Sequence, residues 1–348
     1  MQTRRHDIDW IRVIAICLLL IYHTAIGFQP WGGFIGFIPN NKSWESLWVP
    51  MTMLNVWRIP ILFYVSGMGL YLAIQNRNWK QLFSERFLRI GVPLLFGSLA
   101  IVPLHWLLLE HYYKKDISYM PGLGHLWFLG NILLYVVVLS PIFFILKNKK
   151  DSRPVIFIKK LFSTPVSLLL VILLFVAEVL VLQPGIYEMY AFTLHGLLLG
   201  MLAFLTGFLF MMGGEPFWKM LLTWRWIFLL VAIILFIKRT MFGAAQPPSF
   251  LLAVESNCWI FSVFAFAYKY LNRGNWQLTY LKEAAYPVYI LHMAFLFLGA
   301  WLLFPLKLAV MLKFVLLLSF TLLASLSIYE FVIRRINLLR PLFGLKKK

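Results

Sequence analysis

The chain has 348 residues, of which 61% are hydrophobic and only 13% are charged, and its formal net charge is +19. Apolar runs of about 20 residues, long enough to cross the hydrocarbon core of a bilayer, recur along it and exclude an ordinary soluble protein. A basic soluble chain would suggest nucleic-acid binding. Here the basic residues lie in short connectors between apolar runs, where membrane topology explains them, so we expect no nucleic-acid partner.

Cysteine and histidine usage argues against a metal site or a disulfide framework. The two cysteines, Cys17 and Cys258, both fall inside apolar runs. The seven histidines include no pair at positions i and i+4, and no carboxylate accompanies them at metal-ligand spacing. We therefore expect no catalytic metal.

The apolar windows predict about ten transmembrane helices, near residues 8–28, 48–75, 87–109, 125–146, 165–183, 193–212, 224–240, 249–271, 283–303 and 308–333. The expected fold class is all-α, a polytopic integral membrane protein with a single domain over residues 1–348 and no separate soluble domain. The first span is not expected to be a cleaved signal peptide, because Arg12 interrupts it and no small-residue cleavage site follows.

The distribution of basic residues predicts the topology. If the N-terminus is cytoplasmic, 23 of the 32 Lys and Arg residues fall in inner segments and seven fall in outer segments, while Arg12 and Arg58 lie within spans. Cytoplasmic loops carry an excess of Lys and Arg. Both termini are therefore predicted to be cytoplasmic, in a multi-pass protein of the cytoplasmic (inner) membrane.

The first span, "DIDWIRVIAICLLLIYHTAIGF", carries two polar residues on one face. Arg12 and His23 are eleven residues apart, which at ~100° per residue is about three full turns and roughly 16 Å of rise. Intramembrane ionisable residues tend to mark function. Arg12 could instead pair with Asp9, and His23 could make a helix-packing hydrogen bond. Their shared face weakens both alternatives.

Four further motifs follow in order along the chain. They are "PILFYVSG" from Pro60 to Gly67, "RFLR" with Arg86 and Arg89, "HLWFL" from His125 to Leu129, and "YPVYILH" ending at His292. Together with "RVIAICLLLIYH" in the first span, these motifs resemble the acyltransferase 3 family of integral-membrane acyltransferases. That family includes the membrane enzymes that succinylate periplasmic glucans. The five motifs cover residues 12 to 292, so the resemblance extends over nearly the whole chain.

The resemblance implies an enzyme that moves an acetyl or succinyl group from cytoplasmic acyl-coenzyme A to a hydroxyl of an extracytoplasmic glycan or related cell-surface acceptor. Acyl-coenzyme A is then a substrate, and no cofactor is permanently bound. Arg86 and Arg89, three residues apart at the cytoplasmic mouth, can present two planar guanidinium groups to its phosphates, together with Arg12. The alternative is that they are ordinary positive-inside charges.

His23 suits the acyl-transfer end of such a site. A sugar hydroxyl is a poor nucleophile until a base takes its proton, and imidazole has an ordinary pKa of ~6.5. Direct attack and an acyl-histidine intermediate both remain open. His125 could orient His23 or bind the glycan, or could be an interfacial histidine beside Trp127.

Other polar residues are candidates for the cavity or for helix packing. Ser66 and His292 could line the cavity or act as polar contacts between helices. Arg58 lies deep in the second span and is expected to pair with Glu178 or Glu255. The sequence carries no signal for an oligomeric state.

The competing function is an ion-coupled secondary transporter or flippase, which buried Arg, Glu and His would also suit. Transporters often show a two-fold internal repeat, and no second copy of the first-span or "PILFYVSG" pattern is present. "HYYKKD", from His111 to Asp116, matches a His-x4-Asp acyltransferase pattern but falls in a predicted external loop, away from a cytoplasmic donor. The "DWIR" start and the absence of an attached extracellular domain favour the glucan-modifying branch by analogy.

Overall fold

The computed structural model describes residues 5–149, 151–241 and 247–347, and every regular element in these ranges is helical. A backbone in lipid must satisfy its own hydrogen bonds, and a helix does so within one segment. The predicted all-α membrane fold is confirmed. Arg4, Lys150 and Lys348, which entered the count of basic residues, lie outside the described ranges.

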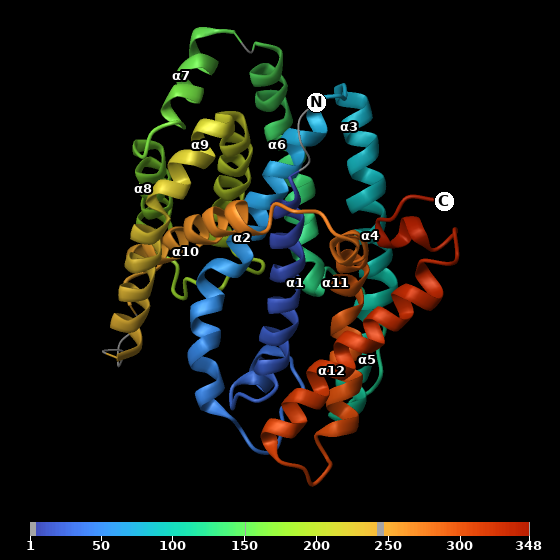
Figure 1. Cartoon of the computed structure of the whole chain (residues 1–348). Helices are drawn as coiled ribbons and strands as arrows, with labels where there is room; N and C mark the ends of the chain where they lie inside the picture. The colour runs from blue at the N-terminus through green and yellow to red at the C-terminus, as the bar shows by residue number, and fades with distance from the viewer. Residues whose placement is uncertain (1–4, 150, 242–246, 348) are drawn as a thin grey trace. The chain divides into compact units, whose positions relative to one another are not determined.

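Twelve α-helices follow one another along the described chain (Figure 1). They are α1 (His6–Ile26), α2 (Trp48–Ile74), α3 (Trp79–Arg86), α4 (Val92–Phe96), α5 (Val102–Tyr112), α6 (Trp127–Asn148), α7 (Arg153–Leu161), α8 (Val166–Leu182), α9 (Leu194–Met241), α10 (Ser249–Tyr270), α11 (Trp276–Leu303) and α12 (Val310–Ile328).

Among the described residues, eight helical segments are long and apolar enough to span a membrane, or nine if α7 and α8, bent by 92°, form one broken span. Of the two spans that separate eight from the predicted ten, one is α8, which is counted only together with α7, and the other lies in α9. Its 48 residues would be roughly 72 Å long as a straight helix, far more than a bilayer requires. Gly214 interrupts it with non-helical angles (φ 66°, ψ −156°), so α9 contains both spans expected at 193–212 and 224–240.

The third predicted span is also irregular. It runs from Trp79 to Tyr112 and includes two π-helical turns, Phe87–Gly91 and Gly97–Ile101, each followed within two residues by a proline. Such turns interrupt α-helices frequently at functional sites. The first of them contains Arg89.

The chain divides into two compact units, which we describe separately. The first comprises Met1–Ala15, Asn55–Ser84 and Asn131–Asn275. Within it α10 packs against α8 and α9. The backbones of α2 and α9 also meet closely: a Cβ on Gly67 would lie 1.9 Å from the carbonyl oxygen of Phe204, and one on Gly207 would lie 2.1 Å from that of Tyr64. Glycine is therefore required at both positions.

The second unit comprises Ile16–Leu54, Glu85–Gly130 and Trp276–Lys348. Within it α11 packs against α12 and α5. One apolar core joins the residues after α1 to α11 and α12, and it contains Phe28, Ile38, Phe297, Phe304 and Leu317. The prediction of a single domain over 1–348 stays a prediction.

Candidate active site

His23 and His292 form the centre of a histidine cluster in the second unit. His23 lies in the last turn of α1, and His292 lies in the middle of α11, fully buried. Their side chains meet with Nδ1 of His23 2.9 Å from Nε2 of His292. The other nitrogen of His292, Nδ1, donates to the carbonyl oxygen of Tyr289 at 2.6 Å. The structure thus brings together two histidines predicted separately from the sequence.

His125 joins this cluster from the short turn Gly124–Leu126 that leads into α6. Its Nε2 donates to the carbonyl oxygen of Ile290 at 3.1 Å, and the Tyr289 hydroxyl donates to the His125 carbonyl at 2.6 Å. The rings of His125 and His292 are 5.1 Å apart, nearly perpendicular. These reciprocal bonds hold the turn against α11. Trp127, the first residue of α6, packs edge-on against Phe128.

Gly124 allows His125 to reach the cluster. Its φ is +46°, a left-handed conformation that favours glycine. A Cβ there would also press on Val102 at 3.0 Å and on the His105 ring at 3.4 Å. The turn that presents His125 therefore depends on a glycine.

His105 on α5 is a cluster member that our interpretation of the sequence missed. It is buried, and its ring lies 5.8 Å from that of His125 and 5.3 Å from that of Phe297. It belongs to none of the five motifs. Its position inside the third predicted span was the available signal, because intramembrane histidines are rare and tend to be functional.

Two of the predicted donor-binding arginines, Arg86 and Arg89, also lie in the second unit. Arg86 ends α3, and Arg89 lies in the π-helical turn, where its Nε is 3.4 Å from Glu85 Oε1. The Arg89 side chain is 41% exposed, so a phosphate can still approach it. The C-terminal segment packs against this turn: a Cβ on Gly344 would meet the Arg89 carbonyl oxygen at 2.9 Å.

Arg12 and Ser66 belong to the first unit. Arg12 lies 3.6 Å from Asp9, which is the alternative pairing considered above, and its Nη2 would be 3.6 Å from a Cβ on Gly69 of α2. Ser66 donates to the carbonyl oxygen of Leu62 at 2.7 Å, as serines in membrane helices often do. Roles for Arg12 in donor binding and for Ser66 in a cavity stay predictions.

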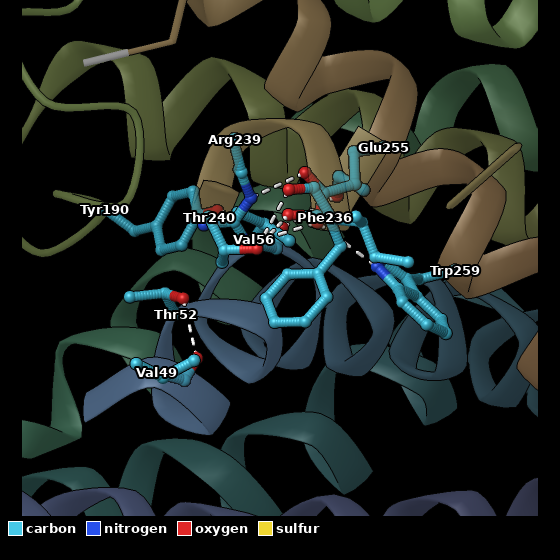
Figure 2. Close-up of polar contacts among 11 residues, drawn as sticks. Val49, Thr52, Val56, Tyr190, Phe236, Arg239, Thr240, Glu255 and Trp259 are labelled. Atoms are coloured by element: carbon cyan, nitrogen blue, oxygen red, sulfur yellow. Dashed lines mark hydrogen bonds and ion pairs between the residues drawn. The ribbon is translucent and has the colours of Figure 1, made fainter. Parts of the chain in front are cut away.

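The buried carboxylates of the first unit have partners from their own neighbourhood. Glu178 Oε1 is 2.9 Å from His195 Nδ1. Glu255 accepts two bonds from Arg239, at 2.7 and 3.1 Å, and one from Trp259 at 3.2 Å (Figure 2). Arg58 is 1% exposed, and its pairing with Glu178 or Glu255 stays a prediction.

The described residues contain no group of three or more His, Cys, Asp or Glu side chains arranged to hold a metal ion. The histidine cluster offers ring nitrogens for hydrogen bonding and proton transfer. A neutral imidazole offers one donor and one acceptor nitrogen, so a pair of them can accept a proton at one end and stabilise it at the other.

Comparison with known proteins identifies the family. The family model described as "Acyltransferase domain" matches residues 5–330. Among curated proteins, "Glucans biosynthesis protein C" from Escherichia coli strain K12 and from strain SMS-3-5 are each 22% identical over 335 residues, covering 86% of this chain and 84% of theirs. No solved structure matches the chain. The chain belongs to the acyltransferase 3 family of integral-membrane acyltransferases.

Proposed function

We propose that this acyltransferase moves an acetyl or succinyl group from acyl-coenzyme A on the cytoplasmic side to a hydroxyl of a glycan or related acceptor outside. The observation that carries the proposal is the imidazole of His23, which lies in the last turn of α1 and is held by His292 of α11, in a chain of this family. The printed name of the relatives favours a glucan as acceptor. The cytoplasmic (inner) membrane is the proposed location.

The reaction requires one base that later acts as an acid. The acceptor oxygen attacks the thioester carbonyl carbon while its proton passes to His23. The carbon–sulfur bond then breaks, and the departing thiolate of coenzyme A takes that proton. The products are an ester on the acceptor and free coenzyme A, with His23 returned to its starting form.

Donor binding is assigned to Arg86, Arg89 and Arg12. Guanidinium groups form paired, charge-assisted hydrogen bonds with phosphate oxygens, and coenzyme A carries several phosphates on its head. The exposure of Arg89 supports this assignment, since Glu85 occupies only one edge of its guanidinium group. The family match also favours an enzyme over the transporter alternative.

The test uses the full chain purified into lipid nanodiscs. It is incubated with radiolabelled acetyl- or succinyl-coenzyme A and a soluble glucan, and label on the glucan is measured. Label transferred as an ester by the wild type, and lost in His23→Gln, supports the proposal. Folded protein that binds coenzyme A yet neither transfers nor hydrolyses either donor contradicts it. Accumulation of unesterified substrate in proteoliposomes would favour transport instead.

A further inference from the structure

The two ring nitrogens of His292 have partners of different kinds, and this determines where the protons lie. Nδ1 is 2.6 Å from the Tyr289 carbonyl oxygen, which can only accept a hydrogen bond. Nδ1 of His292 must therefore carry a proton. In a neutral ring Nε2 is then the acceptor, and it lies 2.9 Å from Nδ1 of His23.

It follows that Nδ1 of His23 is the donor in this contact. A neutral His23 with its proton on Nδ1 carries its lone pair on Nε2. The alternative is a cationic His292, donating from both nitrogens. That ring is fully buried, and within the described part of the chain its hydrogen bonds and ring contacts involve no carboxylate. Burial of an uncompensated charge is costly. The neutral arrangement is therefore favoured.

Ring geometry supports a directed hydrogen bond. The planes of His23 and His292 differ by 8°, and their centroids are 5.2 Å apart. This separation exceeds the nitrogen–nitrogen distance by about the width of one ring, so the rings meet edge to edge. The ring of Phe37 packs on His23 at 5.9 Å, and that of His125 packs on His292 at 5.1 Å, which limits rotation of both imidazoles.

We propose that His292 is a positioning residue that holds His23 in the tautomer protonated at Nδ1, so that Nε2 is the nitrogen that takes the acceptor's proton. This proposal rests on the proposed function. When Nε2 takes the proton, the His23 cation keeps its Nδ1–H bond to His292, and this bond becomes charge-assisted and stronger. Loss of the proton from Nε2 to the thiolate restores the neutral pair. The Tyr289 carbonyl remains bonded to His292 throughout.

The first test measures the tautomer without any turnover. Protein labelled with ¹⁵N in its histidine rings is examined by NMR, and His23 is assigned by the signals lost in His23→Gln. We expect a protonated Nδ1 and an unprotonated Nε2 in the wild type. We expect this preference to be lost in His292→Leu and kept in His292→Gln, whose carboxamide oxygen can accept from Nδ1. A wild-type His23 protonated at Nε2 overturns the proposal.

The second test separates chemistry from binding. We expect His292→Leu to lower kcat by about 10²-fold or more, since a wrong tautomer removes the base, while the KM for acyl-coenzyme A changes little. His292→Gln should recover most of this loss. Met293→Leu, a neighbouring buried change on α11, is the control and should resemble the wild type. Thermal unfolding of each variant in nanodiscs confirms that it is folded.

The two proposals fail in different ways. If His292→Leu is folded, alters the tautomer and transfers at the wild-type rate, His292 is not a positioning residue, whatever the substrate. If the wild-type tautomer is as assigned but no acyl group is transferred from either donor, the proposed function fails. The tautomer assignment would then be correct, but the positioning role of His292 would be rejected together with the proposed function.

Discussion

Nδ1 of His23 and Nε2 of His292 lie 2.9 Å apart, although 269 positions separate the two residues in the chain. The contact joins the last turn of α1 to the middle of α11 within one compact unit. Because His292 also bonds the Tyr289 carbonyl, the ring of His23 is oriented by a partner that is itself anchored to backbone. A general base held in this way needs little reorganisation before it reacts.

The first prediction concerns the base itself. His23→Gln keeps hydrogen-bonding capacity but cannot take a proton at neutral pH, so we expect transfer to fall by ~10²–10⁴-fold. Binding of coenzyme A should be nearly unchanged, because the arginines assigned to it are untouched. Transfer is measured with the labelled donor, and binding by isothermal titration.

His111→Gln provides the matched control for this change. His111 is exposed at the end of α5 and belongs to the "HYYKKD" pattern rather than to the histidine cluster. We expect normal transfer from it. If His111→Gln were inactive and His23→Gln active, the cluster would not be the active site.

The second prediction concerns the donor head. Charge-assisted hydrogen bonds contribute roughly 1.5–3 kcal/mol each, so Arg89→Ala or Arg86→Ala should weaken coenzyme A binding by about one to two decades. Lys80→Ala is the control, since Lys80 is an exposed cation on α3, in the same predicted cytoplasmic segment. Titration calorimetry compares the three variants. Equal affinities in all three variants would mean that the two arginines do not bind the donor and are ordinary positive-inside charges.

The third prediction concerns the close contact of α2 with α9. In Gly67→Ala the new methyl group would lie 1.9 Å from the backbone oxygen of Phe204, and a helix must move to admit it. Overpacking of this kind reduces the free energy of unfolding by about 1–3 kcal/mol. Gly69→Ala, on the same helix, meets only the flexible end of Arg12 at 3.6 Å and should be neutral or stabilising. Thermal unfolding in nanodiscs compares the two variants. Equal stability of Gly67→Ala and Gly69→Ala would contradict the requirement for glycine at position 67.

Hydrophobic periodicity was sufficient to predict the helical membrane fold. His23 stands out as an ionisable residue in an apolar span. His125 and His292 were instead identified by motifs that resemble those of the acyltransferase 3 family. Periodicity gives the depth of a residue in the membrane and its face on a helix. It does not say which helices are neighbours, so the pairing of His23 with His292 could not be predicted.

The same limit explains what was missed. His105 belongs to no motif, and only its contact with the ring of His125 identifies it as part of the cluster. The partners of Glu178 and Glu255 depend on how α8, α9 and α10 are rotated against one another, which composition does not determine. The count of spans differed in part because α9 contains both spans predicted at 193–212 and 224–240, and apolar windows do not show whether one helix continues from the first span into the next.

The fourth prediction is the topology, with both termini cytoplasmic. It follows from the 23 basic residues assigned to inner segments against seven in outer ones. Reporter fusions that are active only outside the cytoplasm should be silent at the C-terminus and active after Lys115. An external C-terminus, or a cytoplasmic residue 115, would reverse the side on which the donor arginines are expected.

The last prediction concerns the buried ion pair of the first unit, Arg239 with Glu255 (Figure 2). Their side chains are 8% and 1% exposed, so Glu255→Gln leaves the buried guanidinium without its carboxylate, which costs ~3–5 kcal/mol of unfolding free energy. Replacing both partners, as Arg239→Met with Glu255→Leu, should recover much of that loss, because no buried charge then lacks its partner.

Thermal unfolding in nanodiscs compares the single and the double variant with the wild type. The exposed pair of Glu215 with Lys219 on α9 is the control, and Glu215→Gln should change the unfolding temperature little, because solvent already screens it. A Glu255→Gln variant as stable as Glu215→Gln would show that the buried pair does not stabilise the first unit. A double variant less stable than Glu255→Gln would show that the two side chains act through other neighbours rather than through each other.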